Sequence, residues 1–358
     1  MSDFLVIGGG IAGISAAARL SHLGRVILLE AENGLGYHAS GRSAALYEES
    51  YGKPSTVALN KASREYLTQA NGGVTSPRGL MIVGSKGHEE AFEKDMAEMS
   101  FSPITVEEAL EKVPILDREV LTGAGFNAEA WDIDTDLLIQ NFAREVRAGG
   151  GEVLTGQQVQ KITREAGRWR VQTQKGEFPA EMLFNAAGAW VDDIARMAGI
   201  APLGFTPYRR SMARLPAPGG HDVSRWPMMF GPGETWYAKP DAGKLLVSPA
   251  EEEATHPHDA WADDLVIAEG LARYEAVVSE PVTRVETTWA GLRTFAPDRC
   301  LVIGPEPDEP SFFWVAGQGG YGFQTSPAAS RLVADIVAGR PPELDKDTVA
   351  ALSPARLR

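Results

Sequence analysis

Two arginines in strand-like sequence could together bind a carboxylate. Arg210 lies in the segment 208–211, and Arg293 ends the segment 288–293. A guanidinium is planar and presents a fork of N–H donors that matches a carboxylate in two-point geometry. Two such groups facing one cavity predict a site for a small organic acid. The alternative is that each arginine is a solvated charge at the end of a strand, as most arginines are.

The N-terminal segment has the pattern of a dinucleotide-binding unit, which would place a cofactor beside that acid. The apolar run Phe4–Ile7 predicts a buried parallel strand, and Gly8, Gly10 and Gly13 follow it in the spacing G-x-G-x-x-G. The first glycine allows a tight turn, the second lets backbone approach a pyrophosphate, and the third lets a helix pack closely. A helix predicted over residues 14–22 would then point its free amides at the phosphates.

An acidic residue completes this unit. A second strand is predicted over residues 25–29, and it ends at Glu30, near the expected spacing of about 20 residues for an acid that binds ribose hydroxyls. A carboxylate at this position argues against a 2′-phosphate and therefore against NADP. The strand, turn, helix, second strand and acid occur in the correct order, which makes the prediction stronger than the glycines alone.

Three segments rich in small residues extend the predicted cofactor site. Residues 37–45, 185–190 and 317–322 would let backbone lie against a flat, bulky ligand. A helix is predicted from about residue 324 to residue 338. Its N-terminal end has a partial positive charge, which would stabilise negative charge on a reduced flavin ring.

Length, charge and cysteine usage limit the class of protein. The 358 residues exceed the usual size of one core, so two domains are expected, and a net charge of −14 argues against nucleic-acid or anionic-membrane partners. Cys300 is the single cysteine, so no internal disulfide framework forms. No apolar run is long enough to span a bilayer. We therefore expect a cytoplasmic protein without a transmembrane segment.

Two further patterns suggest metal sites but lack ligands. The segment 132–136 begins like a calcium loop, but Leu137 occupies the required glycine position and Ala143 the terminal glutamate position. His256 and His258 lie in an acidic loop with no third histidine or cysteine nearby, which predicts solvated surface. No metal site is predicted.

These motifs resemble a known family over nearly the whole chain. The segments 8–30, 41–44, 185–190, 291–293 and 317–322 resemble the FAD-dependent D-amino-acid oxidase superfamily, which includes glycine and sarcosine oxidases. Within it, the segments 37–38, 41–45, 132–136, 209–211 and 319–322 look most like bacterial D-arginine dehydrogenase. The resemblance implies noncovalent FAD, hydride transfer from the substrate α-carbon to flavin N5, and an imino acid product that hydrolyses in water.

The resemblance also implies a fold that is α/β plus α+β. It has a Rossmann-type FAD-binding domain and a discontinuous substrate domain built on a mixed sheet. The expected FAD-binding domain comprises 1–50, 138–204 and 296–345, the substrate domain 51–137 and 205–295, and the C-terminal tail 346–358.

The cofactor residues expected from the motifs and the resemblance form one set. They are Gly8, Gly10, Ile11, Ala12, Gly13, Glu30, Ala31, His38, Ala39, Ser40, Gly41, Arg42, Ser43, Ala44, Ala45, Val159, Ala187, Gly188, Trp190, Gly319, Gly320, Tyr321, Gly322, Phe323 and Gln324.

Five positions match residues that the family uses to hold its substrate. Arg210, Tyr237 and Arg293 fall on the residues that hold the substrate carboxylate, and Tyr51 falls on the lid tyrosine. Gly320 falls on the backbone carbonyl that accepts a hydrogen bond from the substrate amine. No residue is assigned as an obligatory general base, because an amine that arrives deprotonated needs orientation more than proton abstraction.

Two positions depart from D-arginine dehydrogenase. Leu46 stands where that enzyme has a histidine, and Leu80 stands where it has the glutamate that receives a cationic side chain. A guanidinium against Leu80 would lose its partner, so we expect a D-amino acid with an uncharged or apolar side chain. Glu48 or Glu49, on the same loop, is the alternative acid for a cationic side chain.

Two other functions stay open at this point. One is oxidation of glycine, sarcosine or proline-like secondary amines, and the other is a flavin-holding protein without turnover. The electron acceptor is either oxygen or a quinone, since motifs do not encode oxygen access. A quinone-linked enzyme would be peripheral to the membrane.

Overall fold

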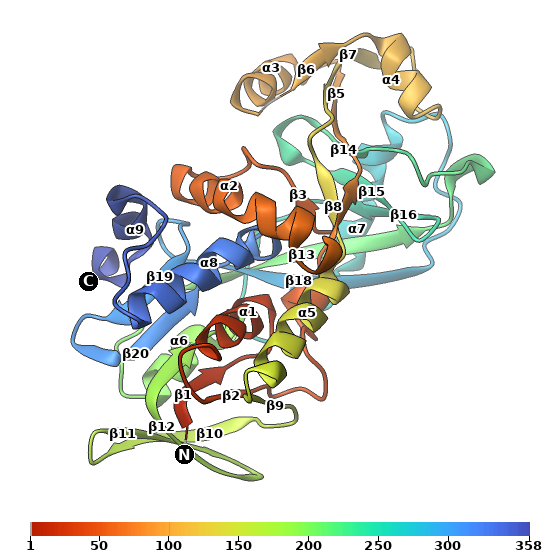
Figure 1. Ribbon diagram of the computed structural model, residues 1–358. Coiled ribbons are helices and arrows are strands. Elements are labelled where there is room, and N and C mark those ends of the chain that lie inside the picture. Colours follow the sequence, from red (N-terminus) through yellow and green to blue (C-terminus); the bar gives the residue numbers. More distant parts are fainter. Residues whose placement is uncertain (1, 100) are drawn as a thin grey trace.

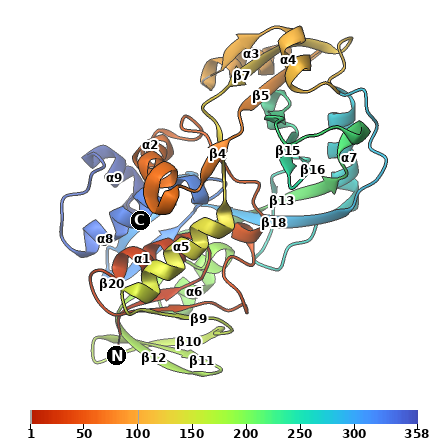
Figure 2. The same ribbon diagram turned by 45° about the vertical axis from the view of Figure 1, so that its right-hand side comes forward.

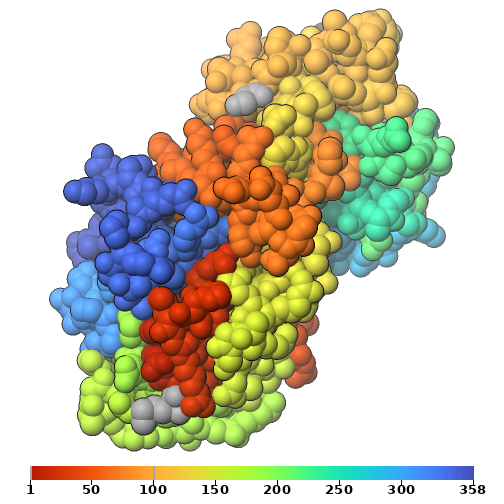
Figure 3. Space-filling model, viewed as in Figure 1, coloured from red at the N-terminus to blue at the C-terminus, as the bar shows by residue number. Residues whose placement is uncertain are grey.

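The structure is a computed structural model, and it describes residues 2–99 and 101–358. Two large sheets, joined by a small third sheet, form the framework, and helices pack on both (Figure 1). The space-filling view shows an elongated molecule, with residues 80–115 at one end and 151–185 at the other (Figure 3). The predicted α/β plus α+β fold class is confirmed.

The first sheet has the parallel core that the N-terminal motif predicts. Strand β1 lies between β2 and β12, and β9 and β20 add parallel strands outside them. A helix or loop must cross over between parallel neighbours, which is why α1 and α5 cover one face. The strands of this sheet are β1 (Ser2–Ile7), β2 (Val26–Leu29), β9 (Glu152–Leu154), β10 (Val159–Glu165), β11 (Arg168–Thr173), β12 (Gly176–Asn185), β19 (Val302–Glu306) and β20 (Glu309–Ala316).

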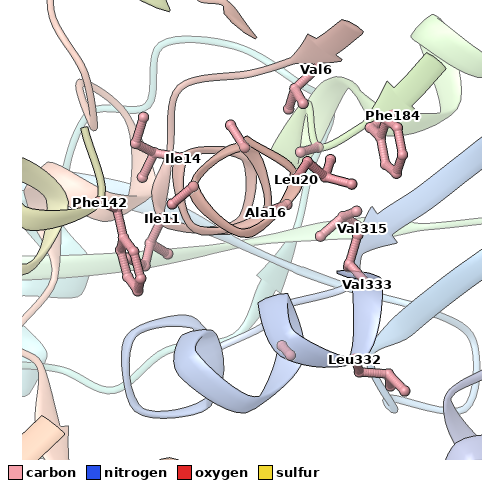
Figure 4. Packing of buried hydrophobic residues seen from close by; sticks show 14 of the residues in the cluster. Val6, Ile11, Ile14, Ala16, Leu20, Phe142, Phe184, Val315, Leu332 and Val333 are labelled. Carbon is pink, nitrogen blue, oxygen red and sulfur yellow. The ribbon is translucent and has the colours of Figure 1, made fainter. Parts of the chain in front are cut away.

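Helix α1 (Ile11–Leu20) packs between α5 (Thr135–Ala148) and α8 (Gly322–Val337). Figure 4 shows its Ile14 and Leu20 among side chains from these neighbours, and both are completely buried. Burying such a side chain contributes about 1.5–3 kcal/mol. The rest of α1 is rich in alanine, which lets α8 approach closely and brings two helix N-termini to one edge of the first sheet.

The second sheet is mixed and has the order β17-β13-β16-β15-β14-β5-β7-β6, with β18 also paired to β13. Figure 2 shows it beside the first sheet, with α3 and α4 at its far end. Its strands are β5 (Leu80–Ser85), β6 (Ser102–Ile104), β7 (Leu121–Asn127), β13 (Thr206–Leu215), β14 (Met228–Phe230), β15 (Tyr237–Asp241), β16 (Lys244–Ser248), β17 (Glu253–Ala254) and β18 (Thr287–Phe295).

A three-stranded sheet joins the two large ones. Strand β8 (Trp131–Ile133) pairs with β3 (Leu46–Tyr47) and with β4 (Thr75–Pro77). The remaining helices are α2 (Pro54–Gln69), α3 (Glu89–Glu98), α4 (Val106–Lys112), α6 (Val191–Met197), α7 (Asp264–Glu275) and α9 (Lys346–Leu352). The segment after β3 therefore leaves a fixed strand and enters the space between the two large sheets.

The predicted domain boundaries remain a proposal. The strands of the first sheet fall within 1–50, 138–204 and 296–345, and those of the second within 51–137 and 205–295. The tail 346–358 is folded: α9 packs near β19, and Arg358 forms an ion pair with the buried Glu306 at 2.6 Å. The segment 132–136 starts a helix instead of a calcium loop, because the Asp134 side chain accepts a hydrogen bond from the Leu137 amide.

Candidate active site

A cavity of about 470 Å³ lies at the carboxyl ends of β1, β2 and β12. Ligands of open α/β sheets bind at this edge. All predicted cofactor residues line it except Gly13, Gly41 and Tyr321. The predicted residues from β1, the 38–45 segment and the start of α8, far apart in the sequence, therefore lie around one space.

The three exceptions lie next to the cavity and pack against the segments that form its wall. A Cβ on Gly13 would lie 1.9 Å from the Gly8 carbonyl oxygen, so this glycine allows α1 to pack on the turn. A Cβ on Gly41 would lie 2.4 Å from the Gly36 carbonyl oxygen. Tyr321 packs its ring 5.2 Å from that of Tyr51. Each position is a packing site next to the cavity.

Glu30 lies at the expected end of the cavity. Its Oε2 accepts a hydrogen bond from the Gly9 amide at 2.6 Å, and its Oε1 accepts one from the Glu32 amide at 2.8 Å. These two bonds hold the carboxylate at the end of β2, where it lines the cavity. Its acceptor-only chemistry suits ribose hydroxyls.

The turn before α1 is shaped for a phosphate group. Gly8 has a φ of +109°, and a Cβ there would lie 2.4 Å from the Ala186 carbonyl oxygen. Gly10 caps α1 without a side chain, and the Ile11 amide donates to Ser40 Oγ at 3.0 Å. Close backbone, a helix N-terminus and a hydroxyl form a donor set that fits the pyrophosphate of FAD.

Arg42 positions the cavity wall. Its Nη1 donates to the carbonyl oxygens of Ala260 at 2.9 Å and Ala290 at 2.8 Å, and its Nη2 pairs with Asp259. The guanidinium is thus committed to protein groups that belong to two other segments. It connects the cofactor loop to β18, on which Arg293 lies.

The opposite end of the cavity suits the flavin ring. Ala44, Ala45 and Gly319 line it, and α8 begins there with no side-chain cap on its N-terminus among the described residues. The buried Lys239 donates to the Ala45 carbonyl oxygen at 2.8 Å and pairs with Asp132 at 2.9 Å. A fixed small-residue loop and a positive helix end fit a flat ring that becomes negative on reduction.

A smaller cavity of about 100 Å³ continues from this end. Its lining includes every residue that was predicted to bind substrate: Leu46, Tyr51, Leu80, Arg210, Tyr237, Arg293 and Gly320. Sequence reasoning did not assign Met99, Met228, Phe230 or Glu234, which also line it. These residues come from loops and from a three-residue strand, which have too little pattern to identify.

Strand register explains why the two arginines meet. Arg210 on β13 pairs with Gly291 on β18, and Arg293 is two residues farther along β18. Diagonal neighbours on one face of an antiparallel pair are about 7–8 Å apart. The ladder therefore presents both guanidinium groups to the same cavity. Tyr237 on β15 lines that cavity too.

The electrostatics of this pair favour an anion. Burial lowers the pKa of Arg210, and the nearby positive charge of Arg293 lowers it further. Burial also opposes the charge on Arg293, but its pKa is raised by the hydroxyls of Tyr237 and Tyr51 and by the acids Glu234 and Glu252. Arg293 makes no ion pair within residues 2–99 and 101–358, while Arg210 makes a 3.3 Å contact with Glu252. A carboxylate between the two would relieve their repulsion.

Tyr51 also lines the smaller cavity. Its hydroxyl donates to Glu234 Oε2 at 3.1 Å, and burial together with Glu234 raises its pKa. Glu234 has a φ of +51° and follows Gly233 in a short 3-10 turn. One hydrogen bond thus joins two loops that the sequence places 183 residues apart.

One sequence prediction was wrong in part, and one alternative is resolved. His258, predicted as solvated surface, lines the cofactor cavity, because its loop folds back toward Arg42. Of the two alternative acids, Glu48 lines the substrate cavity, whereas Glu49 accepts from Tyr47 Oη at 3.2 Å. Across the described residues, no group of three or more metal-ligating side chains occurs.

The fold and the two connected cavities define an FAD-dependent oxidoreductase. The chain belongs to the DAO family, described as FAD dependent oxidoreductase, whose model matches residues 3–336. This agrees with the FAD predicted from the sequence. The helices of the described chain include none that is long and apolar enough to cross a membrane.

Known proteins match over most of their length. The chain is 24% identical to FAD-dependent oxidoreductase domain-containing protein 1 of Bos taurus, covering 94% of this chain and 81% of that protein. It is 24% identical to glycine oxidase of Bacillus licheniformis, covering 95% and 94%. The structure of L-proline dehydrogenase from P. horikoshii superposes with a TM-score of 0.84 at 23% identity, covering 99% and 97%, which shows the common fold.

The first prediction from this site is that FAD is bound without a covalent bond. Cys300, the single cysteine of the sequence, does not line the cofactor cavity. Acid precipitation should therefore release yellow flavin into the supernatant, which its absorbance would measure. Colour that stays in the protein pellet would contradict the prediction.

Proposed function

We propose that this protein oxidises an amino acid, with a D-amino acid that has an uncharged or apolar side chain as the first candidate. The observation that supports this most is the pair formed by the buried Arg210 and the half-buried Arg293, which lies beside the flavin end of the cofactor cavity. A protein that only stores FAD has no use for an anion site there. That this chain resembles bacterial D-arginine dehydrogenase most within its superfamily also remains a prediction.

Each substrate group has a suitable partner in this proposal. Arg210, Arg293 and Tyr237 hold the carboxylate, and the Gly320 carbonyl oxygen accepts from the amine. A Cβ on Gly320 would lie 3.0 Å from Arg293 Cζ, so a larger residue here would push the guanidinium away from its present position. FAD, when bound, supplies the two-electron oxidant that takes a hydride from the α-carbon.

The walls of the cavity favour an uncharged side chain. Leu46, Leu80, Met228 and Phe230 line it, and Leu80 is only 4% exposed. Burying an apolar side chain against them gains about 25 cal/mol per Å², whereas a guanidinium beside Leu80 would lose its hydration. D-Leucine and D-methionine therefore suit the cavity better than D-arginine.

A second candidate is oxidation of glycine, sarcosine or a proline-like secondary amine. The small size of the cavity favours it, since about 100 Å³ is well below the roughly 300–1,000 Å³ of pockets for drug-sized ligands. Two similar proteins bear the names glycine oxidase and L-proline dehydrogenase. The carboxylate site would serve these substrates equally well.

Anaerobic mixing with a panel of D-, L- and N-methyl amino acids tests both candidates. We expect D-leucine or D-methionine to bleach the flavin absorbance faster than D-arginine, because their side chains fill the space between the apolar walls. Faster bleaching by glycine, sarcosine or proline would select the second candidate. If no amino acid bleaches the flavin, the protein holds FAD without this turnover and the proposal is wrong.

The same experiment identifies the electron acceptor. After bleaching, oxygen is admitted to one sample and a soluble quinone to another, and the return of the oxidised absorbance is timed. Fast recovery with oxygen means an oxidase, and fast recovery with the quinone alone means a dehydrogenase. A cytoplasmic location, peripheral to the membrane in the quinone-linked case, remains a prediction.

A further inference from the structure

Glu48 is a buried acid at the substrate cavity for which the proposed reaction has no use. It is 4% exposed and follows β3 directly. Its Oε1 accepts hydrogen bonds from Ser50 Oγ at 2.7 Å and from Asn127 Nδ2 at 3.2 Å. Its Oε2 is buried and has no hydrogen-bond partner among the residues that the structure describes.

A buried oxygen without a hydrogen-bond partner destabilises the folded protein unless a ligand donates a hydrogen bond to it. A buried polar atom without a hydrogen bond loses its hydration and gains nothing in return. Burial also raises the pKa of Glu48, and the hydrogen bonds from Ser50 and from the backbone of Tyr51 offset this only in part. Since Glu48 lines the cavity, a small rotation of its carboxyl group would bring Oε2 to a donor group on a bound molecule.

The position of Glu48 identifies which part of the substrate that donor belongs to. Asn127, which holds the Glu48 carboxylate, is the strand partner of Leu80 on β5. Tyr237 of the carboxylate site lies on β15, and β14 separates β15 from β5. Two strand spacings amount to about 10 Å. The carboxylate of Glu48 therefore lies near the wall for the substrate side chain, away from the wall for its α-carboxylate.

We propose that Glu48 binds an uncharged hydrogen-bond donor at the end of the substrate side chain, most simply a carboxamide. This inference rests on the proposed function and narrows its substrate class to amino acids that are apolar near the α-carbon and polar at the tip. A cationic tip fits less well, because both ions would lose their hydration among Leu46, Leu80 and Met228. A carboxamide loses much less hydration free energy on burial, and its N–H group still donates a hydrogen bond to Oε2.

Glu49 provides a matched control. It is the next residue in the chain, but it does not line the cavity, and its Oε2 accepts from Tyr47 Oη and Arg64 Nη1. The same substitution at Glu49 leaves the cavity wall intact. A change seen with Glu48→Leu but not with Glu49→Leu is therefore specific to the cavity.

The test compares D-glutamine with D-homoleucine, which has the same shape without the amide. Rates of anaerobic flavin reduction over a range of substrate concentrations give a dissociation constant and a limiting rate for each. In Glu48→Leu, the binding preference for D-glutamine over D-homoleucine should fall about tenfold, as expected for one lost hydrogen bond. Glu49→Leu should match the wild type.

A second measurement uses the wild-type holoenzyme and ligands that cannot be oxidised. Glutaramate and 5-methylhexanoate have the same shape and a carboxylate, but neither has an α-amine. Glutaramate should raise the unfolding temperature more than 5-methylhexanoate does. This result does not depend on turnover or on the folding of a variant.

The outcomes separate the inference from the proposed function. Equal effects of the two acids on wild type, or an unchanged preference in Glu48→Leu, would overturn the role of Glu48 even if D-amino acids reduce the flavin. A Glu48-dependent preference for D-lysine over D-glutamine would overturn the uncharged assignment. If no amino acid reduces the flavin but glutaramate still stabilises wild type more, the proposed function fails and the role of Glu48 stands.

Discussion

Replacing Arg293 by methionine should lower kcat/KM for amino-acid oxidation by about 100-fold or more, since a charge-assisted bond of roughly 3 kcal/mol is lost. Arg293 makes no ion pair among the described residues, and it lies diagonally across the ladder from Arg210. Methionine preserves much of the side-chain volume and removes the donors. Steady-state kinetics measure the effect, and the flavin absorbance per protein should stay the same.

Two further variants make this result specific. Arg210→Met should cause a loss of similar size, because both arginines hold one carboxylate. Arg209→Met is the matched control, since Arg209 is the next residue on β13 but pairs with Glu253 and does not line the substrate cavity. Near wild-type kinetics in Arg293→Met would mean that the arginine is not a substrate ligand.

Replacing Leu80 by glutamate should shift the preference of the enzyme toward D-arginine. In wild type, D-leucine should have the higher kcat/KM, because a guanidinium against the apolar wall loses its hydration. A carboxylate at position 80 supplies an ion-pair partner on the wall itself, and the ratio of kcat/KM for D-arginine to that for D-leucine should rise about 100-fold or more, since an unpaired buried charge costs about 3–5 kcal/mol. Measuring kcat/KM for both substrates in both proteins checks this.

Leu80→Gln is the control for size and polarity. Glutamine has nearly the same shape as glutamate but no charge. The ratio of kcat/KM for D-arginine to that for D-leucine in this variant should therefore stay closer to the wild-type ratio. Flavin content shows whether each variant is folded. A wild type that prefers D-arginine or D-lysine would refute the apolar interpretation of the pocket and make Glu48 the partner of the cation.

The cofactor half of the molecule was largely predictable because its signals are local. Gly8, Gly10 and Gly13 are close in sequence and form a recognisable motif, and Gly13 is required by the carbonyl oxygen of Gly8 within the same motif. The helix predicted from residue 324 to 338 occurs as α8, Gly322–Val337, because its apolar period is visible within one segment. Local sequence thus determines the turn, the helix ends and the edge where they meet.

The substrate half depended on the family resemblance because its contacts are long-range. Nothing in the sequence around Arg210 shows that β13 pairs with β18, some 80 residues away, or in which register. A shift of one residue would turn one arginine to the other face of the sheet. The resemblance supplied the residues, and the structure supplied the reason that they line one cavity.

The burial of Glu48 could not be predicted at all. Glu48 and Glu49 are identical in type and adjacent, so composition and periodicity treat them alike. Their difference arises from Asn127 on β7 and Ser50, which hold one carboxylate in the cavity, and from Arg64 on α2, which holds the other outside. The fate of each acid depends on tertiary neighbours that come from separate elements.

The ligands for the substrate carboxylate and the walls for its side chain lie on different strands. Arg210 and Arg293 belong to the β13–β18 ladder, whereas Leu46 and Leu80 belong to β3 and β5. If the proposed roles hold, these two parts of the site can change independently. Substitutions in β3 and β5 would then change which side chain is accepted, while the β13–β18 ladder would keep the site for the carboxylate.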